Sequence, residues 1–224
     1  MACSIQIHTM TNKVLEAAHK FSERLDKELG VPEGFLFGLP GEDEWSFVVK
    51  VAAIVEASVS ELLLATIADN RLHPIFSKMR LRGPDGKIAY LTALELLSKE
   101  QIAFIDQLYL LRNSVVHDIK QVSFVFENYF GALPTERVKS FWSAIVPQRD
   151  VRMLVADPKN CRFVIWLSLL NFLASMQTAK AKQKGDRELQ GLRMKMHEEA
   201  YELVRSAGEL SELEADGVSS REDR

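Results

Sequence analysis

The sequence predicts an all-α protein. Apolar residues recur at steps of three and four over most of its 224 residues, the spacing that places them on one face of a helix. Most of the 11 Gly and 7 Pro lie in 30–44 and 74–86, where these periodic runs are interrupted. Only Gln121–Phe130 partly alternates apolar and polar residues, so this segment is expected to be a short strand or a packed loop.

Two helices are expected in the N-terminal third. Val14, Ala18, Phe21 and Leu25 predict an amphipathic helix over Thr11–Leu29, followed by a loop over 30–44. Trp45–Ala68 predicts a long helix that is apolar around most of its girth, with Lys50, Glu56 and Glu61 as its chief charges. Such a helix is expected to lie centrally and to contact several others.

A basic connection over 70–87 leads to two further helices. A short helix is expected from Ile88 to Leu97. Ser98 and Gln101 have the spacing of a capping box, in which each side chain bonds the other residue's backbone N–H. The capped helix is expected to continue through Val115.

Three C-terminal helices are expected beyond it. A short helix starts at Thr135 and stops at Pro147. Asp157 followed by Pro158 is a strong helix start, and that helix is expected to run to about Lys184. Asp186 then caps a last helix that fades near Gly208, which leaves 209–224 as an acidic, flexible tail.

This organisation gives three parts: an N-terminal helix and loop (1–44), a helical domain (45–208) and the tail (209–224). The net charge of −3 is unevenly spread, because residues 198–224 contain nine acidic and three basic residues, a net −6. Residues 1–197 are therefore +3, which is compatible with a nucleic-acid partner although the pI is near 6.0.

Several classes of protein are disfavoured. Cys3 and Cys161 form no CxxC pair, the histidines show no metal-ligand spacing, and we expect no metal and no cofactor. The longest apolar run, Phe163–Ala174, is shorter than the ~18–20 residues that span a bilayer. No secretory signal is visible at the start, so we expect a cytoplasmic protein without a membrane partner.

One segment contains residues suited to phosphodiester chemistry. Arg112 and Asn113 lie late on the capped helix, and His117 shares a helix face with Asn113. A guanidinium can hold two phosphate oxygens, and an imidazole can transfer a proton near neutral pH. RNA supplies its own nucleophile, the 2′-hydroxyl, so this set needs no metal.

The segment Arg112-Asn113-Ser114-Val115-Val116-His117 resembles the signature of the HEPN superfamily, an Arg separated from a His by four to six residues, commonly with Asn after the Arg. Lys87–Asp118 is similar to the mannitol-operon repressor branch, where a short helix, a capped break and an RN…H helix follow in this order. The resemblance covers roughly Trp45–Lys184.

This resemblance implies an antiparallel helical bundle that forms a homodimer, with the two motifs facing each other in one metal-independent ribonuclease site. Arg112 would clamp the phosphate, His117 would act as general base or acid, and Asn113 would orient them. It also implies an RNA substrate and an antitoxin or regulatory protein partner, as in toxin–antitoxin and antiviral defence systems. Ile119 stands where one subgroup has a Tyr, which disfavours regulation by tyrosine modification.

The alternative is a non-catalytic helical regulator, similar to the repressor branch, that binds protein or nucleic acid, for example in transcription regulation. Arg112, Asn113 and His117 would then form a polar network at a helix end. Asp118 either orients His117 or is simply solvated. Glu56 either pairs with Arg112 or lies on a polar seam with Ser60.

Four basic residues in the connection are candidates for binding a nucleic-acid backbone, although a basic loop is usually just solvated. They are Lys78, Arg80, Arg82 and Lys87.

Overall fold

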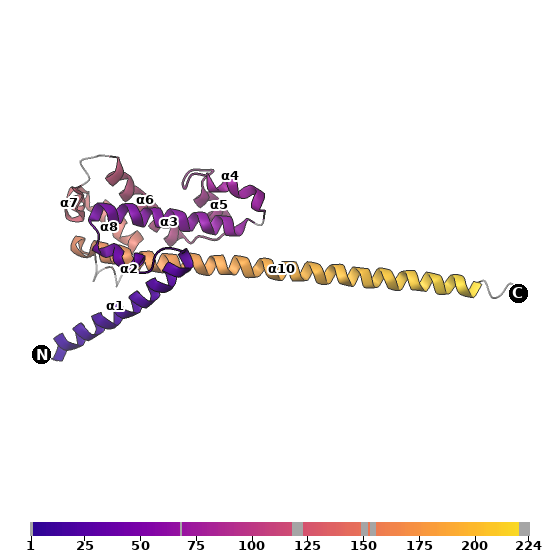
Figure 1. Ribbon diagram of the computed structural model, residues 1–224. Coiled ribbons are helices and arrows are strands. Elements are labelled where there is room, and N and C mark those ends of the chain that lie inside the picture. The colour runs from indigo at the N-terminus through magenta and orange to yellow at the C-terminus, as the bar shows by residue number, and fades with distance from the viewer. Residues whose placement is uncertain (1, 68, 118–122, 149–151, 153–155, 220–224) are drawn as a thin grey trace. The chain divides into compact units, whose positions relative to one another are not determined.

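The computed structural model describes residues 2–67, 69–117, 123–148, 152 and 156–219, and it places side chains between residues 16 and 196 of these ranges. All regular structure in these ranges is helical, which confirms the expected fold class. The chain forms two units, residues 1–180 and 181–224, and helix α10 (Cys161–Ser219) runs through both (Figure 1). In the described ranges, no helix is both long enough and apolar enough to cross a membrane.

Helix α3 (Glu44–Thr66) is the centre of the first unit, as its composition predicted. Asp43 caps it by accepting a hydrogen bond from the Ser46 backbone N–H at 2.9 Å. Its buried face packs chiefly against helix α6 (Lys99–Val116), which lies alongside it in Figure 1. The apolar residues buried on α3 are Phe47, Val48, Val51, Val55, Val59, Leu62 and Leu63.

The capping box at the start of α6 is confirmed. The Gln101 N–H donates to the Ser98 hydroxyl at 3.2 Å, and the Gln101 side-chain oxygen accepts from the Ser98 N–H at 2.7 Å. The Gln101 amide nitrogen also donates to the Ser175 hydroxyl on α10 at 2.8 Å. One residue therefore caps α6 and ties it to a second helix.

The N-terminal helix α1 spans Ala2–Leu29, so it starts earlier than predicted. The expected loop after it contains the short helices α2 (Phe35–Gly38) and η1 (Leu39–Gly41). Buried Asp26 organises this segment, because its two carboxylate oxygens accept the N–H groups of Gly34 and Leu36 at 2.8 and 3.1 Å. The Leu36 carbonyl in turn accepts the indole N–H of Trp166 at 2.7 Å, which ties the segment to α10.

Short helices connect the longer ones. They are η2 (Asn70–Leu72), α4 (His73–Ser77), α5 (Lys87–Ala93), α7 (Phe126–Ala132), α8 (Thr135–Ile145) and η4 (Pro158–Asn160). The predicted starts at Thr135 and at Asp157-Pro158 are confirmed, although the first turn after Asp157 is a 3₁₀ turn that leads into α10.

The structure also decides part of the ambiguous 121–130 segment, in which residues 121 and 122 lie outside the described ranges. Phe126 and Phe130 are four residues apart and share the buried face of α7, where the Phe130 ring lies 4.9 Å from Phe141 and 5.8 Å from Trp142 between centroids. Helical burial of these aromatic residues, rather than strand alternation, explains their spacing.

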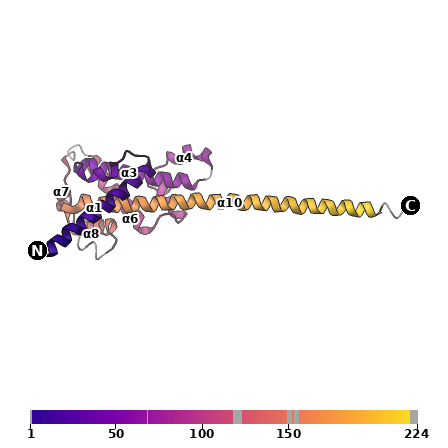
Figure 2. The ribbon, with the colours of Figure 1, turned by 60° about the horizontal axis from the view of Figure 1, so that its bottom comes forward.

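The predicted break between two C-terminal helices at Gly185-Asp186 is wrong. Helix α10 continues from Cys161 to Ser219 without interruption (Figure 2), so residues 209–219 of the expected flexible tail are helical. A glycine inside a helix costs only about 1 kcal/mol relative to alanine, which is too little to end a long helix by itself.

We expect the substitution Asp26→Ala to lower the free energy of unfolding by about 3 kcal/mol, because it leaves two backbone N–H groups without their buried acceptor. Chemical denaturation with a helical circular-dichroism readout measures this loss. The matched control is Glu28→Ala, on the exposed face of the same helix, which should stay within about 0.5 kcal/mol of the wild type. Equal effects of the two substitutions would contradict the role given to Asp26.

Candidate functional site

The C-terminal end of α6 carries Arg112 and Asn113, and His117 follows as its C-cap. Leu108, Leu111 and Val115 are buried against the core and fix the rotation of the helix, and Arg112 lies at the edge of this buried face. The indole N–H of Trp45, on α3, donates to the Val115 carbonyl at 3.3 Å. This contact satisfies one carbonyl of the last turn and holds the helix end that carries the motif.

Arg112 is half-buried, and its Nη1 atom donates to the Asn113 side-chain oxygen at 3.1 Å. Both interpretations of the sequence, an orienting role for Asn113 and a structural polar network at the helix end, include such a contact. In the described part of the chain no carboxylate lies within 4.0 Å of the guanidinium. A guanidinium has five N–H donors, so most of its donors and its full charge are available to an anion.

His117 is exposed, and its backbone N–H donates to the Asn113 carbonyl at 3.4 Å, which closes the helix. Its imidazole makes no hydrogen bond within the described ranges. At 100° per residue, Arg112 and His117 lie about 140° apart around the helix axis. Asn113 and His117 share a face, whereas Arg112 is turned away from that face. Asp118 lies outside the described residues.

A cleft of about 140 Å³ lies between α3 and α6 at Arg112. Its polar side chains are Glu56 from α3 and Tyr109 and Arg112 from α6. Apolar residues form the rest of its lining: Val49, Ala52, Ala53, Val55, Leu81, Ile105 and Leu108. The lining of the cleft is therefore mostly apolar, with one cationic, one anionic and one phenolic side chain.

Glu56 lines this cleft but forms no ion pair with Arg112 within 4.0 Å, although both residues are described. Its side chain is exposed, and its backbone carbonyl accepts the Ser60 hydroxyl at 2.7 Å. The pair of Glu56 with Arg112 is therefore not formed, and the position of Glu56 on a polar seam with Ser60 stays a prediction.

Tyr109 is a residue of this cleft that sequence reasoning missed. The guanidinium carbon of Arg82 lies 5.1 Å from the centre of the Tyr109 ring, and Arg82 Nη2 pairs with Asp106 Oδ1 at 3.1 Å. The spacing from Tyr109 to Arg112, three residues on one helix, is a signal that points to a shared face.

The four basic candidates of the connection differ in their exposure. Lys78 and Arg80 are exposed, and Arg82 is half-buried in its contacts with Asp106 and Tyr109. Lys87 is only 4% exposed, and its ammonium donates to the Ser60 hydroxyl at 2.7 Å and to the Ser77 carbonyl at 3.2 Å. The prediction that Lys87 contacts a nucleic-acid backbone is therefore corrected, since its charge is used inside the protein.

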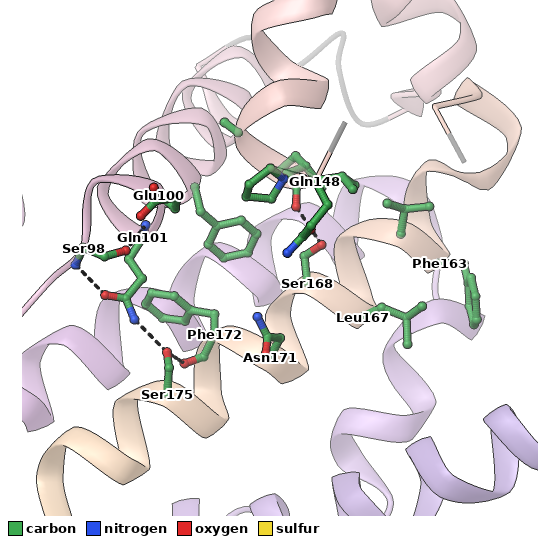
Figure 3. A pocket seen from close by; sticks show the side chains of 16 residues that line it. Ser98, Glu100, Gln101, Gln148, Phe163, Leu167, Ser168, Asn171, Phe172 and Ser175 are labelled. Atoms are coloured by element: carbon green, nitrogen blue, oxygen red, sulfur yellow. Dashed lines mark hydrogen bonds between the residues drawn. The ribbon is translucent and has the colours of Figure 1, made fainter. Parts of the chain in front are cut away.

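A larger cavity, of about 570 Å³, lies where the start of α6 meets the end of α8 and the first turns of α10 (Figure 3). Figure 3 shows Gln101 and Ser175 hydrogen-bonded on one side of it, with Phe172 and Asn171 facing the space. Glu100 is the one ionisable residue of its lining, and hydrogen bonds from its own N–H and from Ser98 lower the pKa of that carboxyl. This cavity lacks the cation and the proton-transfer group of the motif.

Cys161 does not add a nucleophile to either space. It is fully buried, and this burial raises the pKa of its thiol far above the ordinary value, so the reactive thiolate is disfavoured. Within the described ranges, no group of three or more His, Cys, Asp or Glu side chains is arranged to hold a metal ion.

No protein-family model, curated protein or solved structure matches this chain significantly.

We expect Lys87→Ala to lower the free energy of unfolding by about 2 kcal/mol, because it removes two hydrogen bonds from a buried charged group together with the packing of the lysine stem. Urea denaturation measures the loss, and exposed Lys78→Ala serves as the matched control, with a change below about 0.5 kcal/mol. A Lys87→Ala protein as stable as the control would refute the internal role of Lys87.

Proposed function

We propose that this protein is a metal-independent endoribonuclease of the HEPN type that acts as a homodimer. The observation that carries the proposal is the state of Arg112, a guanidinium oriented by Asn113 at a cleft and without a carboxylate partner in the described part of the chain. Partial burial of a cation without an ion-pair partner costs free energy, and a bound anion would offset this cost. The phosphate of RNA fits its charge and its geometry.

The chemistry follows from the groups present. A His117 imidazole removes the proton of a ribose 2′-hydroxyl, and the resulting oxygen attacks the adjacent phosphorus. The bond from phosphorus to the 5′-oxygen breaks, a second imidazole protonates that oxygen, and Arg112 stabilises the negative charge on the phosphoryl oxygens. The products are a 2′,3′-cyclic phosphate and a 5′-hydroxyl, and no metal or water enters this step.

The dimer supplies what one chain lacks. The reaction uses a base and an acid, whereas one protomer has a single His117. In addition, Arg112 and His117 of one protomer lie on different sides of α6. Two α6 ends facing each other would bring together two imidazoles and two guanidinium groups. A regulatory protein partner, such as an antitoxin, would act by covering or separating these ends.

A non-catalytic regulator is the second candidate. It is favoured by the bond between Arg112 and Asn113, because a purely structural polar network at a helix end would contain the same contact. On this alternative, exposed Lys78 and Arg80 would bind a nucleic-acid backbone without cleaving it.

We expect the full-length protein to cleave RNA in the presence of EDTA, and His117→Ala and Arg112→Ala to lower the cleavage rate by at least about 100-fold, since each removes a group that acts in the transition state. The matched control is Arg137→Ala, an exposed arginine on α8, which should keep the wild-type rate. Cleavage is measured on a broad panel of labelled RNAs, with light scattering to verify the oligomeric state. A wild-type dimer that cleaves no RNA of the panel would refute the nuclease and favour the regulator.

A further inference from the structure

The second unit of the chain, residues 181–224, contains only the continuation of α10 within the described ranges. Four apolar side chains on this continuation are largely exposed: Leu189 at 57%, Leu192 at 58%, Met194 at 70% and Met196 at 68%. A long helix in water gains most of its stability from packing an apolar face, and this one has no such packing from its own unit. The exposed apolar face therefore requires a partner.

The spacing of this apolar face identifies the kind of partner. Leu189, Leu192 and Met196 are separated by three and four residues, and the sequence continues the pattern within α10 at Leu203, Leu210 and Leu213. We call these six positions the apolar stripe. All four heptads that start at Leu189 have an apolar first position, and the first and last of them also have an apolar fourth position, while Glu199 and Ser206 occupy the two middle ones. An apolar residue repeated every seven positions is typical of a helix that pairs with another helix.

The charge along the same helix is strongly asymmetric. Residues 181–197 contain five basic and two acidic residues, whereas residues 198–219 contain seven acidic residues and one arginine. Two copies that pair in parallel would place like charges beside each other along the whole contact. Two copies that pair antiparallel would place the basic half of each beside the acidic half of the other.

We propose that the 181–219 part of α10 forms an antiparallel two-helix coiled coil with a second copy of this chain. The stripe runs from Leu189 to Leu213, so its midpoint is Tyr201, and the two-fold axis of the pair passes near this residue. The apolar stripe supplies the attraction, and the charge asymmetry fixes the orientation.

Other occupants fit the same helix less well. A nucleic acid or an anionic membrane surface would be repelled by residues 198–219, and a nucleic acid would leave the apolar stripe in water. The inference does not rest on the proposed ribonuclease. Both the coiled coil and a contact between two α6 ends are isologous, so one dimer contains both contacts if they share a two-fold axis, and a larger assembly forms if they do not.

A distance measurement between spin labels tests this orientation. The label is placed by Arg187→Cys, off the apolar stripe, in full-length protein whose Cys3 is replaced by serine, while Cys161 is fully buried. Arg187 lies 14 residues from the midpoint, so pulsed electron resonance should give a label separation of about 42 Å at 1.5 Å of rise per residue. A separation below about 20 Å would mean a parallel pair, and the absence of any dipolar signal would mean no pairing; either result overturns the proposal.

Two substitutions show whether a measured distance comes from the coiled coil. Leu192→Asp places a charge on the apolar stripe and should abolish the signal at about 42 Å, without unfolding the protein because the side chain is already exposed. Met194→Asp is the matched control, since Met194 is 70% exposed but lies off the stripe, and it should leave the signal unchanged. A signal that survives Leu192→Asp comes from another contact and also overturns the proposal. None of these readouts depends on RNA cleavage.

Discussion

Helix α3 packs a buried apolar face, which includes Phe47, Val51 and Val55, against α6. This contact positions the end of α6 that carries the candidate site. Burying one such side chain contributes about 1.5–3 kcal/mol, more than the roughly 1 kcal/mol of a typical hydrogen bond. The apolar contact therefore determines how α6 is rotated, and the bond from Trp45 to the Val115 carbonyl then adjusts its last turn. Arg112 reaches the cleft because it lies at the edge of the buried face of α6, beside Ile105 and Leu108 in the cleft lining.

The same packing explains why charged residues of similar appearance have different roles. Lys87 lies where α5 meets α3, and its ammonium donates hydrogen bonds to the Ser60 hydroxyl and the Ser77 carbonyl. Arg82 is shared between Asp106 and Tyr109. Arg112 has only the neutral Asn113 as its hydrogen-bond partner in the described part of the chain. Arg112 lines the cleft without an ion pair within 4.0 Å in the described part of the chain, although Glu56 lines the same cleft. This feature favours an anionic ligand over a purely structural role.

Features encoded by neighbouring residues were predictable from the sequence, whereas those that depend on distant partners were not. The apolar girth of α3, the capping box at Ser98 and the helix start at Asp157 are local patterns, and the structure confirms each. The carboxylate of Asp26 acts on Gly34 and Leu36, eight and ten residues away, and nothing in its own neighbourhood indicates this. The motif at Arg112 was visible because its spacing is local, but its cleft was not, because residues of α3 and Leu81 complete it. The break predicted at Gly185 was wrong because one glycine costs too little to end a helix.

The central claim is that Arg112 and His117 act on the phosphodiester through the RNA's own 2′-hydroxyl. Cleavage of an RNA that carries a single 2′-deoxy nucleotide at the mapped cleavage position, compared with the all-ribose strand in EDTA, tests this claim most directly. The account predicts that the all-ribose strand is cut to a 2′,3′-cyclic phosphate and that the 2′-deoxy substitution abolishes cutting at that position alone. Continued cutting at the 2′-deoxy position, or cutting of the all-ribose strand that disappears in EDTA, would contradict it.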